Sequence, residues 1–149
     1  KQIVVSADPD SVKRFGEVPR EKGGRAVPLR VSGAWHSPLI QEAEAPFRRA
    51  LEAVSFQEAE KGLLFNVTAA SEADPEAMKE NMARQLVNPV RWYDIMMRLL
   101  ADGVTRFVEV GPGKVLTGMA RKIVPEGGPC EVVNISTLKA LDVWMNAAQ

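Results

Sequence analysis

The sequence has little of what marks a secreted, membrane-spanning or metal-binding protein. Among 149 residues it contains one cysteine, Cys130, and one histidine, His36. A single cysteine excludes an internal disulfide and favours a reducing compartment, so we expect a cytoplasmic location. No apolar run approaches the ~18 residues needed to span a bilayer, and no signal segment opens the sequence. Neither HExxH nor CxxC occurs, so no metal site is predicted.

The chain also lacks an excess of charge of either sign, because 19 Lys and Arg balance 19 Asp and Glu. This balance predicts neither nucleic acid nor an anionic membrane as a partner. The pairs Arg48-Arg49 and Arg121-Lys122 could meet phosphate or an acidic helix, but we favour ordinary surface charge as their explanation. The length and the 46% hydrophobic content suit a globular domain with a sizeable core.

The hydrophobic pattern predicts an α/β protein. Strands are expected at 2–6 and 25–31, around a helix from Pro9 that Pro19 should end early or break. A helix over 38–54 should kink at Pro46. From residue 62 onward strands and helices alternate, which is typical of a mainly parallel sheet. The elements expected there are strands at 62–69, 105–111 and 130–135, and helices at 74–87, 90–103, 115–124 and 137–148.

The glycine-rich stretch EVGPGKVL (Glu109–Leu116) invites comparison with a phosphate-binding loop. The pattern G-x-x-x-x-G-K-[ST] fails, because Val108 stands five residues before Gly113 and Val115 follows Lys114 in place of a hydroxyl. We therefore predict a strand-to-helix turn in which the glycines adopt tight backbone angles.

The most informative short stretch is VSGAWHSPLI (Val31–Ile40), which contains His36. Histidine exchanges a proton near neutral pH, but a lone histidine is more often structural or exposed than catalytic. Two features favour catalysis: the residue follows a predicted strand in a loop, and Pro38 fixes the start of the next helix. The local sequence leaves both interpretations open.

Four stretches in series carry a family resemblance: VPLRVSGAWHSPLI, LLFNVTA, RQLVNPVRW and FVEVGPGKVLTGMARKI. Together they resemble the C-terminal part of the malonyl-CoA:acyl-carrier-protein transacylases, the acyltransferase family of fatty-acid and polyketide synthesis. The resemblance covers nearly the whole chain. It implies that residues 1–30 end a small ferredoxin-like subdomain and that residues 31–149 belong to a larger α/β-hydrolase-like acyltransferase subdomain.

The resemblance also implies a reaction and its residues. In the family, a serine attacks malonyl-CoA, and the acyl-serine ester passes to the phosphopantetheine thiol of acyl-carrier protein. His36 matches the catalytic base, and the backbone carbonyl of Gln85, in the Q-L-x-x-P-V motif, matches the group that orients it. No cofactor is implied beyond the coenzyme A thioester substrate. Trp35 is bulky, like the Phe common in malonyl-using relatives, and favours unbranched malonyl, although plain packing also explains it.

The family's G-x-S-x-G nucleophile turn has no match in this sequence. Ser37 adjoins His36 but lacks the strand–turn–helix context of a nucleophile. We therefore expect roughly the C-terminal half of the enzyme, inactive by itself. Because a divided sheet exposes an edge and an apolar face, we expect a companion: the N-terminal half or a second copy. The alternative is a non-catalytic module that binds acyl-carrier protein or supports assembly.

Overall fold

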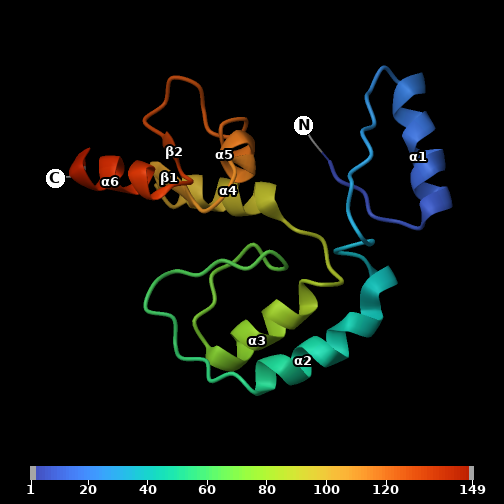
Figure 1. Cartoon of the computed structure of the whole chain (residues 1–149), viewed down its shortest axis with the longest axis horizontal. Helices are drawn as coiled ribbons and strands as arrows, with labels where there is room; N and C mark the ends of the chain where they lie inside the picture. The colour runs from blue at the N-terminus through green and yellow to red at the C-terminus, as the bar shows by residue number, and fades with distance from the viewer. Residues whose placement is uncertain (1–2, 148–149) are drawn as a thin grey trace. The chain divides into compact units, whose positions relative to one another are not determined.

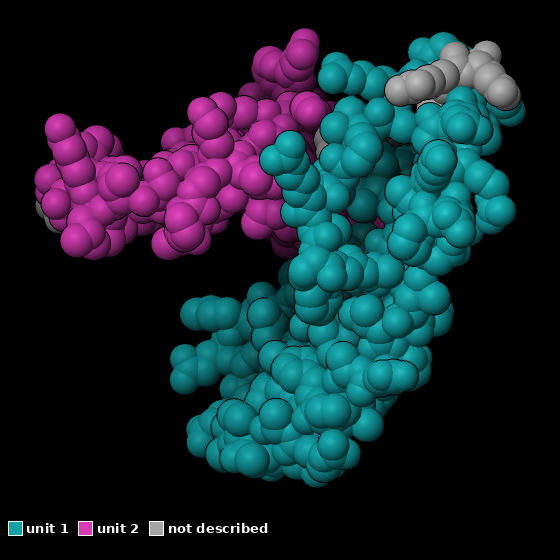
Figure 2. All heavy atoms as spheres, turned by 45° about the vertical axis from the view of Figure 1, so that its right-hand side comes forward, with its two compact units in different colours: residues 1–91 teal, residues 92–149 magenta. Residues whose placement is uncertain are grey.

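The computed structural model describes residues 3–147, except for the side chains of 19–21 (Figure 1). The chain divides into two compact units, Lys1–Arg91 and Trp92–Gln149, coloured teal and magenta in Figure 2. Each unit is described separately below. The subdomain boundary expected after residue 30 stays a prediction. Among residues 3–147, none of the helices is long and apolar enough to cross a bilayer.

The first element described in the first unit is helix α1 (Pro9–Glu21). The Asp8 carboxylate accepts a hydrogen bond from the backbone N–H of Ser11 at 2.9 Å, which confirms the expected N-terminal cap. The prediction that Pro19 ends the helix early or breaks it in two is wrong, because α1 continues through Pro19 to Glu21 as one helix. A proline removes a single backbone donor, and close to a helix end that loss is small.

The strands predicted at 2–6 and 25–31 are absent from the residues that the structure describes, where both segments are irregular; Gln2 lies outside those residues. A strand needs a neighbour that pairs with its backbone N–H and C=O groups, and local β-branched composition does not supply one. Apolar side chains in both segments are exposed, among them Ile3 at 81% and Val27 at 61%.

The predicted helix over 38–54 is a 3-10 helix, η1 (Pro38–Ala43), followed by α2 (Glu44–Glu52). The backbone bends at Ile40, where φ and ψ are −112° and 23°, so the prediction of a kink at Pro46 is wrong. Pro46 falls in the first turn of α2, where a helix N–H has no partner within the helix, so its ring disturbs nothing.

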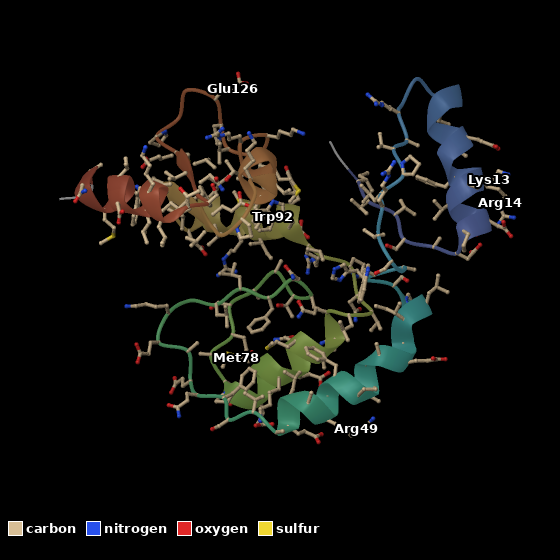
Figure 3. All side chains as sticks on the ribbon, in the orientation of Figure 1. Lys13, Arg14, Arg49, Met78, Trp92 and Glu126 are labelled. Carbon is tan, nitrogen blue, oxygen red and sulfur yellow. The ribbon has the colours of Figure 1, made fainter. Side chains whose placement is uncertain are left out.

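Helix α3 (Pro75–Arg84) begins as predicted, with Asp74 accepting a hydrogen bond from the N–H of Ala77 at 2.8 Å. It packs against α2, and the two lie side by side in Figure 1. Leu51 and Met78 are buried on these helices; Figure 3 labels Met78. Ala83 of α3 is buried as well, so three of the buried apolar residues described in the first unit lie on these two helices.

The strand predicted at 62–69 is mostly a turn. Only one antiparallel bridge forms, between Leu64 and Ser71. The chain folds back at once, because the N–H of Phe65 donates to the carbonyl of Ala70 at 3.1 Å and that of Ala69 to the carbonyl of Phe65 at 2.8 Å. Phe65 and Ala69 are buried. This 65–70 turn holds Asn66 beside the candidate site.

The second unit confirms the predicted alternation of helices and strands. Strands β1 (Arg106–Val110) and β2 (Glu131–Ile135) pair in parallel, in a register from Arg106↔Glu131 to Val110↔Ile135. Helix α5 contacts both strands and α6 contacts β2. The helices are α4 (Trp92–Ala101), α5 (Val115–Ala120) and α6 (Leu138–Ala147). The buried apolar residues of this unit are Ile95, Met96, Ala120 and Ile135.

Candidate active site around His36

His36 lies in the loop before η1 with a left-handed backbone, at φ 61°. Its N–H donates to the carbonyl of Leu86 at 3.0 Å, which ties the loop to the segment after α3. Non-glycine residues seldom adopt this conformation, and they keep it where surrounding contacts impose it. The backbone thus aims the imidazole in a direction that an ordinary loop would not favour.

The imidazole Nδ1 of His36 lies 2.7 Å from the backbone carbonyl oxygen of Gln85. A carbonyl can only accept a hydrogen bond, so this contact places the proton on Nδ1. In the neutral ring Nε2 then carries the free lone pair. The residue is exposed, and Nε2 has no hydrogen-bond partner among the side chains and backbone groups that the structure describes. This arrangement allows Nε2 to accept a proton from a group brought to the site.

Ser37, next to His36, does not present a nucleophile. It is buried, and its hydroxyl donates to the carbonyl of Ala34 at 2.7 Å. The same oxygen accepts a hydrogen bond from the N–H of Leu39 at 3.3 Å and so caps η1. With its proton engaged and its oxygen enclosed, this hydroxyl stabilises the loop.

Trp35 precedes His36 and leaves 45% of its surface exposed. Its carbonyl accepts a hydrogen bond from the hydroxyl of Ser6 at 2.7 Å, so the N-terminal segment braces the loop. The exposed indole therefore extends from a loop whose backbone is held on both sides of the histidine.

Asn66 is a residue that the sequence did not identify. Its side-chain Nδ2 donates to Oε1 of Gln85 at 3.3 Å. The only signal in the sequence was a polar residue within the apolar stretch LLFNVTA, which was interpreted as a strand. The 65–70 turn, rather than a strand, brings this amide to the residue that holds His36.

The glycine turn after β1 is a strand-to-helix connection, as predicted. Gly111 and Gly113 have φ values of 130° and 86°, which favour glycine. The Glu109 carboxylate accepts hydrogen bonds from the N–H and hydroxyl of Thr117, at 2.8 and 2.5 Å, and from the N–H of Leu116 at 3.1 Å. The side-chain amide of Asn134 donates to it at 3.3 Å. The N–H groups of Leu116 and Thr117, in the first turn of α5, are thus occupied by this chain's own carboxylate.

These hydrogen bonds, first that from the Thr117 hydroxyl and then that from its N–H, hold the pKa of Glu109 below its usual value.

Among the described residues, no group of three or more His, Cys, Asp or Glu side chains could hold a metal ion. At His36 itself, the structure shows an imidazole held at Nδ1 by a neutral carbonyl.

The fold is shared with a class of enzymes, the transferases that act on acyl carrier proteins. One solved structure is an acyl carrier protein S-malonyltransferase from Vibrio cholerae; it matches with a TM-score of 0.82 and 35% identity, over 91% of this chain and 44% of that one. A second holds a type II PKS acyl-carrier protein in complex with its malonyl-transacylase, with a TM-score of 0.78 and 30% identity, over 93% of this chain and 44% of that one.

A curated relative, the malonyl CoA-acyl carrier protein transacylase of Bacillus subtilis (strain 168), is 38% identical over 123 residues. The chain belongs to the malonyl-CoA:acyl carrier protein transacylase family. The match covers 82% of this chain but 39% of the relative, so the chain spans less than half of that protein's length. No family model matches the chain.

Proposed function

We propose that this chain supplies the histidine base for transfer of a malonyl group from coenzyme A to the phosphopantetheine thiol of acyl-carrier protein, in fatty-acid biosynthesis in the cytoplasm. The 2.7 Å contact between His36 Nδ1 and the Gln85 carbonyl carries the proposal, because it leaves Nε2 free to take a proton. The names of the matched proteins support the reaction, and the solved complex of a malonyl-transacylase with its acyl-carrier protein supports the partner.

In this proposal the nucleophilic serine comes from the part of the relatives that this chain does not span. His36 Nε2 accepts the hydroxyl proton as the serine oxygen bonds to the malonyl carbonyl carbon. The carbon–sulfur bond then breaks, and the imidazolium gives its proton to the departing coenzyme A sulfur. In the second half, the phosphopantetheine thiol gives its proton to Nε2 and attacks the ester. The serine leaves with that proton, and both groups return to their starting states.

The use of a carbonyl in place of a carboxylate has a consequence for proton transfer. A carboxylate beside the imidazole would stabilise its charged form strongly, whereas the neutral Gln85 carbonyl fixes the tautomer with less charge stabilisation. An imidazolium that is stabilised less gives its proton up more readily to the departing sulfur, which suits transfer between two thiols. The reaction needs no cofactor beyond the coenzyme A thioester that serves as substrate.

Two further assignments belong to the same proposal. Trp35 contributes to acyl-group selection: its exposed indole stands next to the base, where a bulky ring leaves less room for a branched acyl chain. Residues 1–30 end a ferredoxin-like subdomain, and residues 31–149 form part of an α/β-hydrolase-like subdomain. The parallel pair of β1 and β2, with helices against it, supports the second of these assignments.

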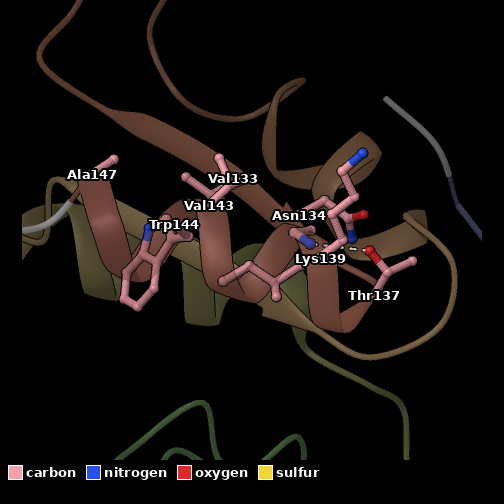
Figure 4. Close-up of a pocket in the computed structure, with 9 residues that line it drawn as sticks. Val133, Asn134, Thr137, Lys139, Val143, Trp144 and Ala147 are labelled. Atoms are coloured by element: carbon pink, nitrogen blue, oxygen red, sulfur yellow. Dashed lines mark hydrogen bonds between the residues drawn. The ribbon is translucent and has the colours of Figure 1, made fainter.

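The chain also requires a companion. Large apolar side chains are exposed in each unit taken by itself, and soluble proteins rarely leave such side chains uncovered in contiguous patches. In the second unit, Val110 of β1 is 75% exposed, and an open groove between β2 and α6 is lined by Val133 and Val143 (Figure 4).

The occupant that we assign to this groove and to the free edge of β1 is the remainder of the family fold. The matched structures extend well beyond this chain, which covers 44% of each, so more than half of such a protein is available to cover these surfaces. A second copy of this chain is the competing outcome. Without a companion, the chain lacks a nucleophile and should be inactive.

The test is native mass spectrometry followed by a transfer assay. The protein is isolated in its longest native form, called the full-length protein below, and malonyl transfer to acyl-carrier protein is measured for that form and for residues 1–149 alone. Transfer is expected only when a segment carrying a G-x-S-x-G serine is present. Self-paired residues 1–149 would favour the second copy. Carrier-protein binding without transfer in the longest form would indicate the non-catalytic binding module instead.

A further inference from the structure

Gln85 makes two contacts of different kinds. Its main-chain carbonyl accepts from His36 Nδ1 at 2.7 Å, and its side-chain Oε1 accepts from Asn66 Nδ2 at 3.3 Å. The three residues come from a loop, a helix end and a turn that lie far apart in the sequence. They form one chain of hydrogen bonds that runs from Asn66 to the imidazole.

The position of Gln85 explains why its side chain needs to be held. It is the C-terminal cap of α3, and the last carbonyls of a helix have no partner within that helix. The peptide group that carries the Gln85 carbonyl is tied to the helix only by a long hydrogen bond, from the Leu86 N–H to the carbonyl of Ala83 at 3.4 Å. A contact to the side chain restrains the whole residue, including the carbonyl that meets His36.

The backbone around Asn66 is itself held in place by hydrogen bonds and burial. Its carbonyl accepts a hydrogen bond from the N–H of Arg91 at 3.0 Å, and its neighbour Phe65 is buried and bonded within the 65–70 turn. An amide anchored in this way can orient Gln85, whereas an amide on a loose loop would follow it.

We propose that Asn66 is a positioning residue that sets the orientation and tautomer of His36 through Gln85. The catalytic meaning of this role rests on the proposed transfer function, but the role itself does not. Loss of the Asn66 amide should free the Gln85 carbonyl to turn. His36 Nδ1 would then lose its acceptor for part of the time, and the imidazole would populate the Nε2–H tautomer.

The primary readout is the tautomer of His36, measured by long-range ¹H–¹⁵N correlation in the full-length protein labelled with ¹⁵N-histidine, with the His36 signal assigned by its loss in His36→Gln. The native protein is expected to show the Nδ1–H tautomer, and Asn66→Ala a mixture. Asn88→Ala is the matched control: its Nδ2 donates to the Arg84 carbonyl at 2.8 Å in the same segment, and it should leave the tautomer unchanged.

Gln85→Met provides a second, independent variant, because it keeps the main-chain carbonyl and removes the side-chain acceptor. It should shift the tautomer as Asn66→Ala does, and the double variant should shift it no further. An unchanged Nδ1–H tautomer in folded Asn66→Ala overturns the proposal. Where Asn66→Ala does not fold, an unchanged tautomer in Gln85→Met overturns it.

The secondary readout separates this inference from the proposed function. In the transfer assay, Asn66→Ala should lower kcat about tenfold with little change in the KM for malonyl-CoA, as expected when a supporting contact of a catalytic group is lost. If the native full-length protein transfers no malonyl group, the proposed function fails, and the tautomer measurement alone decides the role of Asn66.

Discussion

His36, in the loop before η1, and Glu109, beside the glycine turn after β1, are both ionisable residues held by hydrogen bonds, but they are held in different ways. We call the two segments the His36 loop and the Glu109 turn. The Glu109 carboxylate accepts four hydrogen bonds, from two backbone N–H groups, a hydroxyl and an amide. The His36 imidazole is held through Nδ1 alone, and its side chain is exposed. Both oxygens of the Glu109 carboxylate are thus occupied by hydrogen bonds, whereas Nε2 of His36 is left available to a substrate.

This difference separates a structural group from a reactive one. Glu109 links β1 to the first turn of α5 and, through Asn134, to β2, so its bonds hold three elements together. An imidazole with a fixed tautomer and an open Nε2 is prepared to exchange a proton with a substrate. The glycine-rich motif resembles an anion site in sequence, but the side chain that is available to a substrate, His36, belongs to the first unit.

The largest effect should come from removing the base. In the full-length protein, His36→Gln should lower malonyl transfer by roughly 10²–10⁴-fold, because no other group in the site accepts the nucleophile's proton. The melting temperature should change little, since the side chain is exposed. Transfer within tenfold of the native rate, in a protein with an unchanged melting temperature, would show that the open Nε2 is not used.

A smaller effect is expected from the neighbour of the base. Trp35→Ser should raise the kcat/KM for a methyl-branched malonyl thioester relative to malonyl by roughly tenfold, the order of discrimination that one methyl group allows in an apolar site. Competition assays with both thioesters measure this ratio. An unchanged ratio would leave Trp35 as a loop residue with a packing role alone.

For the Glu109 turn the expected loss is in stability rather than activity. Glu109→Gln replaces one acceptor oxygen with an amide that faces the Thr117 and Asn134 donors, so thermal unfolding should begin at a lower temperature. Glu126→Gln, at the exposed residue labelled in Figure 3, makes the same chemical change and should have no effect. Reduced transfer per folded molecule in Glu109→Gln would contradict a purely structural role.

The same carboxylate predicts a pH dependence of stability. Because its hydrogen bonds hold the pKa of Glu109 below the unfolded value, the folded state favours the ionised form. This contribution is complete above the unfolded pKa and is lost as the pH falls through the folded pKa. The free energy of unfolding should therefore fall less steeply with acidification below about pH 5 in Glu109→Gln than in the native protein. Parallel curves would contradict this linkage.

The smallest effect is expected at an exposed ion pair, which should contribute less to stability than the hydrogen-bonded Glu109 carboxylate. Arg48 on α2 bonds both Glu44, at 2.7 Å, and Glu80 of α3, with its side chain 37% exposed. Arg48→Met should lower the free energy of unfolding by about 1 kcal/mol or less, and by less again in high salt. Urea titration at two salt concentrations measures both changes. A larger, salt-independent loss would show that Arg48 acts mainly through packing.

The second unit could be predicted from its sequence, as could the starts of α1 and α3 in the first unit. Short segments with the apolar spacing of a strand alternate in the second unit with segments that have the apolar spacing of a helix. The local pattern therefore predicts each of four elements: β1, α5, β2 and α6. The segments 3–6 and 25–31 have strand-like composition but no strand partner among the described residues, and composition cannot supply one. Whether these segments form strands depends on which distant segment pairs with them, and their own residues do not specify that segment.

The candidate site divides in the same way. His36 and Gln85 could be named from family motifs, although only the structure measures the contact between Nδ1 and the carbonyl. Asn66 could not be named, because its role depends on a turn at 65–70 that an apolar stretch disguises as a strand. A residue that acts through another leaves no chemical signature in the sequence.

The most direct test of the central claim, that His36 is a base for a nucleophile outside this sequence, is to locate the malonyl group. The full-length protein is incubated with malonyl-CoA, quenched in acid, digested and mapped by mass spectrometry, beside His36→Gln. We predict a malonyl ester on a serine outside residues 1–149, lost in the variant. An ester on a residue of this chain, or one that forms equally well without His36, would contradict the account.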